Sequence, residues 1–370
     1  METTITITTI NKPEFLGGLC KNISEYGHKD TDIVIIGDIK TPPIEYFCKG
    51  IGNWYGVPIE YLDIDKQEKT IPKPLLDMFA YNTPDRTILG GMLSYLRGSQ
   101  LIIAIDDDNY VTDADFVGWH SDVGKVKNRQ LIQTDTGWFN VHESLESDIE
   151  FYPRGYPFGQ RYKKVKGKIL YQEKRAVVNQ GLVLGDPDID AMQRLIHPIN
   201  ALKMKPPAPE SNRHLMRSSL RIDGKLEEQY GLYETWSPFN YQNTCLYREL
   251  IPCYFRPKSG LRNADIWTAY IFNKLANHMG DVITFGQPLV RQERNGHNLF
   301  DDLDVEIQNN RETDYFCELI GNTKLTKDYY WGALTELITL AILNLHTDYP
   351  MTRSFLEEYR VWLEVVDKLL

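Results

Sequence analysis

The first 110 residues alternate between short apolar strands and helical segments, and this alternation leaves few folds open to the chain. Residues 3–10 are β-branched throughout and predict a strand, and residues 32–37 and 58–63 predict two more. Residues 14–26 and 86–96 carry apolar positions at helical spacing. Parallel strands need crossover connections, which helices usually supply, so the pattern predicts a parallel α/β sheet.

The alternation weakens beyond residue 110. Residues 129–134 and 175–184 predict strands, residues 263–279 predict a helix, and the chain is mostly helical from residue 328 onward. Residues 199–230 contain a proline-rich stretch followed by charged, weakly periodic sequence, and we expect a flexible insertion there.

We therefore expect one α/β domain over residues 1–310 and a helical C-terminal extension over residues 311–370. The apolar face of the extension could cap the domain or join two copies of the chain in a homo-oligomer. Nothing in the sequence chooses between these two roles.

Charge and cysteine usage exclude several classes of protein. The 370 residues carry 41 Lys and Arg against 51 Asp and Glu, a net charge of −10, which argues against nucleic acid as the principal partner. The five cysteines are scattered and form no Cys-x-x-Cys pair, which predicts reduced thiols in a cytoplasmic protein. No apolar run approaches the ~18 residues of a membrane span, so we expect no transmembrane segment.

The most informative segment is the apolar run at residues 101–105, which ends directly in Asp106, Asp107 and Asp108. Ligands of open α/β sheets bind at the carboxyl ends of the strands. Strand alternation places Asp106 and Asp108 on one side and Asp107 on the other. Paired carboxylates suit Mg²⁺ or Mn²⁺. A solvated acidic turn or a helix N-cap is the plainer explanation, but the buried strand before the triplet favours a metal site.

Four further segments follow in an order that is more specific than the triplet alone. After IDDD at 105–108 come RGYPFGQR at 154–161, NQGLVLGDPDIDAMQRL at 179–195, NTCLYRELIPCYF at 243–255 and RNADIW at 262–267. In this order they resemble the plant reversibly glycosylated polypeptides, whose active members are UDP-arabinopyranose mutases. The chain is similar more widely to nucleotide-sugar glycosyltransferases of the GT-A fold.

This resemblance implies a GT-A-like fold, with a mixed, mainly parallel sheet flanked by helices. It implies a metal-dependent glycosyltransferase with a nucleotide-sugar donor, most simply a UDP-sugar, and a sugar or small-molecule acceptor. Asp106 and Asp108 would hold Mn²⁺ or Mg²⁺, and Asp107 would help to bind the donor. Asp265 would face the acceptor, where a carboxylate can act as a general base. Asp265 would equally suit a helix N-terminus, where the dipole favours an acidic residue.

Three arginines are candidates for binding the diphosphate. Arg154 and Arg161 flank a turn that contains Gly155 and Pro157, and guanidinium groups provide bidentate donors to phosphate. Arg86 stands nearest to the position at which the mutases become reversibly glycosylated, although the sequence around it differs from theirs. Ordinary surface positions would explain the same arginines without any ligand.

The remaining candidates lie at predicted strand ends. Thr9 and Asn11 close the first strand and Asp38 follows the second, where this class of fold holds the base and ribose of a nucleotide. Many enzymes of this fold supply a late histidine as a further metal ligand, and His297 is the candidate here. The mutase-family histidine aligns better with Gln292. Loop residues without a ligand are the alternative at each of these positions.

Two other functions fit the same residues. One is a UDP-sugar mutase that transfers the sugar transiently to Arg86 and returns it in the other ring form. The other is a non-catalytic subunit that binds a nucleotide sugar. Release of the nucleotide separates the transferase from the mutase, because a mutase conserves the nucleotide sugar.

Overall fold

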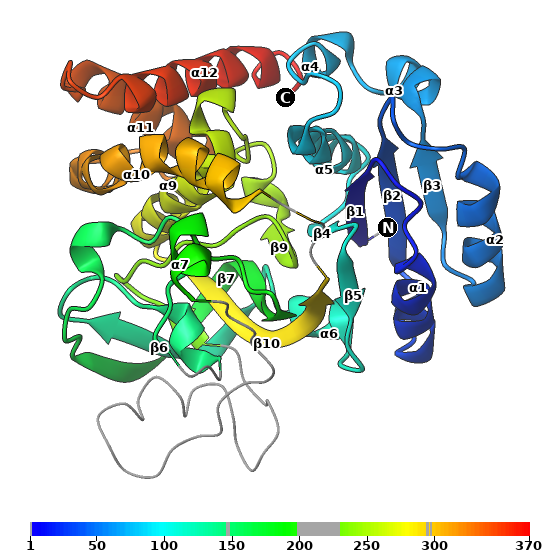
Figure 1. Cartoon of the computed structure of the whole chain (residues 1–370), viewed down its shortest axis with the longest axis horizontal. Helices are drawn as coiled ribbons and strands as arrows, with labels where there is room; N and C mark the ends of the chain where they lie inside the picture. Colours follow the sequence, from blue (N-terminus) through cyan, green and yellow to red (C-terminus); the bar gives the residue numbers. More distant parts are fainter. Residues whose placement is uncertain (1, 146–148, 198–229, 294–295, 297) are drawn as a thin grey trace.

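The computed structural model describes residues 2–145, 149–197, 230–293, 296 and 298–370 of the chain. Across these residues one sheet of ten strands runs through the molecule, in the order β3-β2-β1-β4-β9-β7-β6-β8-β10-β5 (Figure 1). The strands are β1 (Thr3–Thr9), β2 (Thr31–Gly37), β3 (Ile59–Leu62), β4 (Leu101–Asp106), β5 (Asn109–Val111), β6 (Val126–Thr134), β7 (Gly167–Gly185), β8 (Tyr230–Leu232), β9 (Thr244–Tyr247) and β10 (Val282–Gln292).

The N-terminal part of the sheet is parallel. Strand β1 pairs in parallel with β2 on one side and with β4 on the other, and β2 pairs in parallel with β3. The carboxyl ends of β1, β2 and β4 therefore lie side by side at one edge of the sheet, because the last residues of the three strands are in register. The helices of this part are α1 (Leu16–Glu25), α2 (Glu45–Tyr55), α3 (Ile64–Thr70), α4 (Lys73–Leu76), α5 (Thr87–Leu96) and α6 (Phe116–His120).

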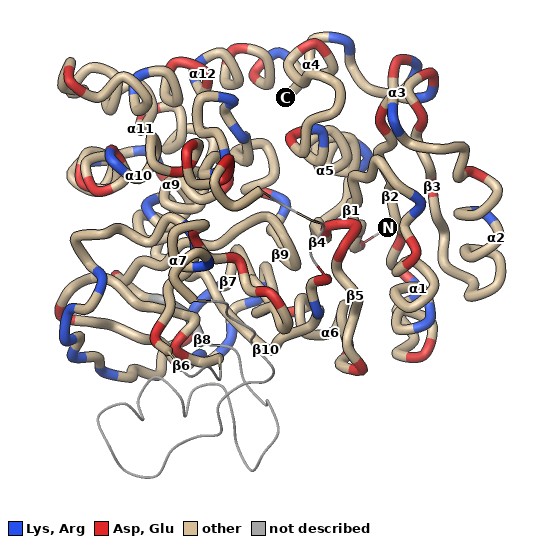
Figure 2. Tube along the Cα trace, in the orientation of Figure 1, with Lys and Arg blue, Asp and Glu red and all other residues tan. Residues whose placement is uncertain are grey.

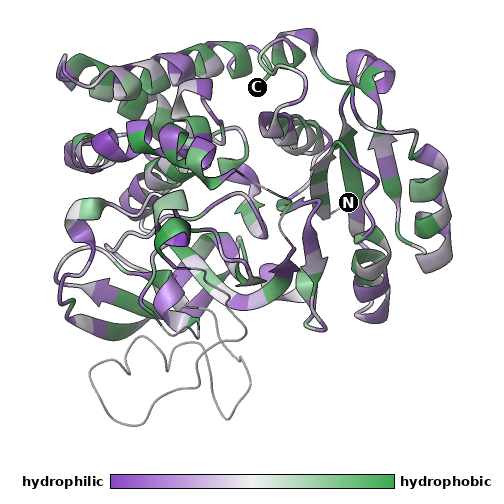
Figure 3. Cartoon of the chain, viewed as in Figure 1, coloured by the Kyte–Doolittle hydropathy of each residue, from purple (hydrophilic) through white to green (hydrophobic). Residues whose placement is uncertain are grey.

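Strand β2 shows how helices cover both faces of the parallel part. Ile33 and Ile35 are buried in a cluster with residues of α1, whereas Val34 and Ile36 are buried in a second cluster with residues of α5. Both faces are apolar because successive side chains of a strand point to opposite sides. Figure 3 shows these central strands as mainly hydrophobic ribbon between mixed helices.

The second part of the sheet contains both parallel and antiparallel pairings, and β10 is its last strand along the chain. Strand β9 pairs antiparallel with β4 and with β7, which joins the two parts. Strand β10 pairs in parallel with β7 and then, near its end, antiparallel with β5. The last pairing sets Gln292 opposite Asn109, so the end of β10 lies beside the acidic triplet.

Helices from the last third of the chain pack over the second part of the sheet (Figure 1). They share one large apolar cluster with β7, β9 and β10, in which the rings of Trp267 and Phe316 stack at 4.4 Å between centroids. The predicted boundary at residue 310 falls inside one of these helices. They are α9 (Ala264–Met279), α10 (Leu299–Asn322), α11 (Tyr330–Asn344) and α12 (Pro350–Val366), and the short α7 (Ala191–Ile196) lies beside α10.

The predicted class, an α/β fold with a mixed sheet flanked by helices and a helical C-terminal part, is confirmed. The predicted strands and helices of the first 110 residues are present, but α2 was not predicted, because its two glycines and its aromatic residues weaken the helical pattern. The predicted insertion at 199–230 lies almost wholly outside the described residues. All five cysteines are free and buried. No helix in the described part of the chain is long and apolar enough to cross a bilayer.

A buried histidine ties the two parts of the sheet together. His120 is fully buried at the end of α6, where its Nδ1 lies 2.9 Å from the amide nitrogen of Asn179 on β7. Its Nε2 lies 3.2 Å from the side-chain oxygen of Asn243, which precedes β9. Burial lowers the pKa of His120 to about 4, although the hydrogen bond to Asn243 opposes this shift. The neutral imidazole therefore accepts from Asn179 and donates to Asn243.

We expect the His120 imidazole to make folding stability pH-dependent. The pKa is lower in the folded chain, about 4, than the ~6.5 of an unfolded histidine, so its stabilising effect is complete above about pH 6.5. It is lost as the pH falls toward 4, by at most about 3 kcal/mol. Urea unfolding of wild type and His120→Gln should therefore give free energies of unfolding that differ most near pH 7 and converge toward pH 4.5. A difference that stays constant over this range would contradict the prediction.

Candidate active site

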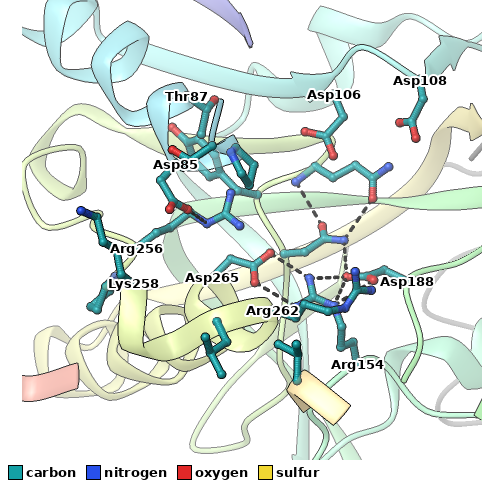
Figure 4. A pocket seen from close by; sticks show the side chains of 18 of the residues that line it. Asp85, Thr87, Asp106, Asp108, Arg154, Asp188, Arg256, Lys258, Arg262 and Asp265 are labelled. Atoms are coloured by element: carbon teal, nitrogen blue, oxygen red, sulfur yellow. Dashed lines mark hydrogen bonds and ion pairs between the residues drawn. The ribbon is translucent and has the colours of Figure 1, made fainter. Parts of the chain in front are cut away.

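A cavity of about 480 Å³ lies at the edge where the parallel strands end, and we call it the central cavity. Its volume is in the range of small-molecule binding sites. Its walls include the turn before α5, the end of β4, the segment before β9 and the segment that leads into α9 (Figure 4). Arg154, Asp188, Gln292 and Val305 complete the lining. The charged side chains that line it are Asp85, Asp106, Asp108, Arg154, Asp188, Arg256, Lys258, Arg262 and Asp265.

The side chains of the acidic triplet alternate in direction, as predicted. Asp106 ends β4 and Asp108 stands in the turn before β5, and both line the central cavity (Figure 4). Asp107 turns away from the cavity, and its Oδ2 accepts a hydrogen bond of 2.6 Å from the Thr9 hydroxyl. In Figure 2 this turn is drawn in red, the colour of Asp and Glu. The structure thus brings two of the three carboxylates into one space.

These two carboxylates crowd each other. Asp106 is exposed and lines the cavity, where desolvation by the surrounding walls together with the nearby Asp108 raises its pKa to about 7. Asp108 accepts hydrogen bonds from the side-chain amides of Asn109, at 2.7 Å, and Gln292, at 3.1 Å. Gln292, at the end of β10, therefore occupies the place at which we expected a residue from late in the chain to contact the triplet. His297, the other candidate for that place, lies outside the described residues.

Asp106 and Asp108 could serve a divalent cation as its two carboxylate ligands, since both line the central cavity. Among the described residues, no group of three or more His, Cys, Asp or Glu side chains is arranged to hold a metal ion. Mg²⁺ is commonly bound by one or two carboxylates and completed by water and substrate phosphate oxygens. The pKa of Asp106 is raised by desolvation and by Asp108, which indicates that a positive charge beside the pair would be stabilising.

The predicted nucleoside residues meet in one hydrogen-bond network at the ends of β1 and β2. The Thr41 hydroxyl donates to the Thr9 carbonyl and accepts from the Asp38 backbone N–H, both at 2.6 Å. The Asn11 backbone N–H donates to the Thr9 hydroxyl at 2.9 Å. The Asp38 carboxylate accepts from the Asn82 backbone N–H at 2.6 Å. The structure thus brings Thr9, Asn11 and Asp38 together beside Asp107.

Arg86 is not a cavity residue, which corrects its expected role at the diphosphate and as a sugar carrier. Its side chain is 2% exposed and donates to the side-chain oxygen of Gln67 and to the Phe79 carbonyl. Its Nε lies 3.8 Å from Asp38. The short helical turn at Pro84–Arg86 presents Asp85 to the cavity and directs Arg86 into the protein. A guanidinium so enclosed has no room to receive a sugar.

Arg154 lies in the central cavity but bonds to carboxylates there. Its Nη1 and Nη2 donate to the two oxygens of Asp265 at 3.1 and 3.0 Å. Its Nε and Nη2 donate to Asp188 at 2.8 to 3.0 Å. Asp265 also accepts from the Ile266 backbone N–H at 3.0 Å, at the start of α9. Arg154 therefore fixes two cavity carboxylates, and we call these three residues the arginine–carboxylate cluster.

Arg161 lies outside the central cavity lining, contrary to its expected role at the diphosphate. Its guanidinium donates to the Tyr156 carbonyl and to the buried carboxylate of Asp190, and it lies 3.9 Å from the centroid of the Phe158 ring. These contacts fold the RGYPFGQR turn against α7. Arg161 is a structural residue of that turn.

Several cavity residues were not predicted. Arg256 lies 3.3 Å from Asp85, and although burial opposes its charge, Asp85 and Asp265 raise its pKa. Lys258 and Arg262 follow in the same segment, and Arg262 bonds to Asp302 and Glu306 of α10. One signal could have identified them, namely a cluster of three cationic residues within seven positions. Asn240, Gln242 and Asp188 were also not predicted. Asp188 lies within the segment 179–195, and Asn240 and Gln242 directly precede the segment 243–255.

Comparison with known proteins gives little further guidance. The sequence matches no protein family profile and no curated protein. Among solved structures, residues 1–349 of S. aureus TarS in complex with UDP align at 10% identity and a TM-score of 0.38, covering 100% of this chain and 92% of that chain. The TarS complex with UDP-GlcNAc aligns at 10% identity and a TM-score of 0.35, with the same coverage. At these values no function is transferred, and neither finding supports the resemblance to the mutase family.

One residue of the cavity wall is held in a strained backbone conformation. Leu261 has φ 48° and ψ −132°, a region that glycine enters easily and a branched side chain does not. Its side chain is 37% exposed and lines the central cavity. The chain thus keeps an apolar side chain in the cavity at a cost in backbone free energy.

We expect Leu261→Gly to be more stable than Leu261→Ala by about 1 kcal/mol, because only glycine relieves the strain. At an ordinary helical position the order is reversed, since glycine is less stable than alanine by a similar amount. Both variants remove the same side chain from the cavity, so urea unfolding compares them directly. A more stable alanine variant would contradict the strain at this residue.

Proposed function

We propose that this chain is a metal-dependent glycosyltransferase that moves a sugar from a nucleotide-sugar donor to the hydroxyl group of an acceptor. The supporting observation is that one cavity contains both the acidic pair, Asp106 and Asp108, and the arginine–carboxylate cluster. The pair would hold the diphosphate through a cation, and the cluster would hold a carboxylate near the acceptor. A UDP-sugar is the first donor to test.

Asp106 and Asp108 would hold the cation, Mn²⁺ or Mg²⁺. When bound, it would act as a Lewis acid that neutralises the diphosphate leaving group. Two protein carboxylates leave the remaining coordination positions to water and to phosphate oxygens. This arrangement agrees with the crowding of negative charge that raises the pKa of Asp106.

The nucleoside would lie along the ends of β1 and β2, where Thr9, Asn11, Asp38 and Asp107 share hydrogen bonds. This edge is continuous with the acidic pair, because β1 lies between β2 and β4. A nucleoside there would present its diphosphate to Asp106 and Asp108. The polar backbone and side-chain groups at these strand ends suit a base and a ribose.

In the transfer, the acceptor oxygen forms a bond to the anomeric carbon while the bond from that carbon to the phosphate oxygen breaks. The electron pair of the broken bond leaves with the nucleoside diphosphate. In an inverting transfer, the acceptor's proton passes to Asp265. Oδ1 of Asp265 accepts from Arg154 and from the Ile266 backbone N–H, whereas Oδ2 accepts from Arg154 and keeps a second lone pair that can take this proton.

We expect the purified protein with Mn²⁺ to release nucleotide slowly from one member of a panel of UDP-, GDP- and dTDP-sugars, as followed by chromatography. Asp108→Asn should lower the rate by ~100-fold or more, because it weakens the hold on the cation and the diphosphate. Asp113→Asn is the matched control, since Asp113 is exposed, lies close in sequence and does not line the cavity. Absence of nucleotide release, together with absence of any thermal shift from the nucleotides, would contradict the proposed function.

Asp265 and Asp188 permit a second test, because both carboxylates bind Arg154. Asp265→Asn should lower the rate of transfer by ~100-fold or more, the usual contribution of a general base. Binding of UDP with Mn²⁺, measured by calorimetry, should change less than ~3-fold in the same variant, because that ligand occupies the other end of the cavity. Asp188→Asn should lose much less activity. Equal losses in both variants would show that the cluster acts only as a structural unit.

A further inference from the structure

Three side-chain amides form a hydrogen-bonded chain that begins at the arginine–carboxylate cluster. The amide nitrogen of Asn240 donates to Asp188 at 2.9 Å and to the side-chain oxygen of Gln242 at 3.2 Å. The side-chain oxygen of Asn240 accepts from the amide nitrogen of Gln180 at 2.6 Å. Asn240, Gln242 and Asp188 all line the central cavity, and the dashed lines at Asp188 in Figure 4 include this contact.

The direction of every amide in this chain is fixed by Asp188. A carboxylate that pairs with Arg154 is ionised and can only accept hydrogen bonds, so Asn240 must turn its NH₂ group toward it. The same NH₂ group then meets Gln242, which must present its oxygen. The NH₂ group of Gln242 is thereby forced to the far side, away from Asn240.

That NH₂ group lacks a partner. Gln242 is 4% exposed, and its Nε2 is buried with no hydrogen-bond partner among the residues that the structure describes. A buried donor that stays unpaired costs free energy, and such groups are rare in folded proteins. The rest of the side chain is held, because its oxygen and the backbone N–H of Gln242 both bond to Asn240. The donor is therefore presented in one direction and needs an oxygen.

The position of Gln242 indicates which oxygen it meets. Gln242 is connected through Asn240 to Asp188 of the arginine–carboxylate cluster, and it lines the same cavity as the acidic pair. If the diphosphate binds at the pair and the acceptor at the cluster, the sugar in transfer lies between them. A sugar hydroxyl also suits this place chemically, since it can accept from the amide and donate to a nearby carboxylate, whereas carboxylates repel an anion.

We propose that Gln242 binds the transferred sugar by donating a hydrogen bond from Nε2 to one of its hydroxyl groups. The assignment rests on the proposed function and adds to it a residue that selects the sugar. Asn240 is then a positioning residue, because it fixes the orientation of the Gln242 amide without contacting the sugar.

The test compares the active donor with its monodeoxy analogues, each lacking one sugar hydroxyl, in nucleotide-release assays. Wild type should lose about tenfold in kcat/KM with one analogue through this missing contact. Gln242→Ala and the similarly long Gln242→Met should lose about tenfold with the full donor and nothing further with that analogue. Gln160→Ala, a glutamine outside the cavity, should keep the wild-type pattern.

Each other outcome overturns the assignment. If both Gln242 variants discriminate against every analogue as wild type does, the amide contacts no sugar hydroxyl. If the variants weaken binding of UDP with Mn²⁺ as much as they lower kcat/KM, the partner is a phosphate oxygen. If the wild type is active and a Gln242 variant is equally active, the proposed function stands and only the proposed role of Gln242 is rejected. A wild type that neither binds nor cleaves any nucleotide sugar would reject both.

Discussion

The contact on which the rest of the site depends is the bridge from Arg154 to Asp188 and Asp265. One guanidinium, nearly buried, holds a carboxylate that follows β7 and another at the start of α9, which lie 34 and 111 residues away in sequence. Removing one member of a buried pair leaves an uncompensated charge, at a cost of about 3–5 kcal/mol. The bridge therefore fixes the N-terminus of α9 against the sheet, and through Asp188 it also orients Asn240 and Gln242.

A second constraint is the course of β10, which completes the site from the far end of the chain. The N-terminal strands bring Asp106 and Asp108 to the sheet edge, where Asn109 also bonds to Asp108. Strand β10 first follows β7 and then pairs with β5, and this places Gln292 in contact with Asp108. The two parts of the sheet thus each provide one wall, and neither part alone contains the central cavity.

The sequence predicted the features that depend on local order. The alternation of strands and helices gave the parallel sheet, and the two-residue period of β4 correctly separated Asp107 from its neighbours. It could not assign the arginines, because their roles depend on partners distant in sequence. Arg154 was expected at a phosphate and bonds to two carboxylates instead, while a single turn directs Arg86 inward and leaves Asp85 in the cavity. Arg256 belongs to no recognisable motif, and its place is set only by the fold.

The distribution of charge in the central cavity explains why its two ends suit different groups. Arg154 offsets Asp188 and Asp265, and Arg256 lies beside Asp85, while Arg262 is bonded to Asp302 and Glu306 of α10. Among the described residues, Asp106 and Asp108 form no ion pair, so no cation in direct contact offsets the negative charge of this end. A diphosphate cannot approach it without a cation, because like charges would meet at short range. At the cluster end Arg154 contacts both carboxylates, and the one negative charge that it leaves there favours a neutral hydroxyl over an anionic group. The cavity thus separates a place for a charged leaving group from a place for an uncharged nucleophile, as transfer between a nucleotide sugar and an acceptor hydroxyl requires.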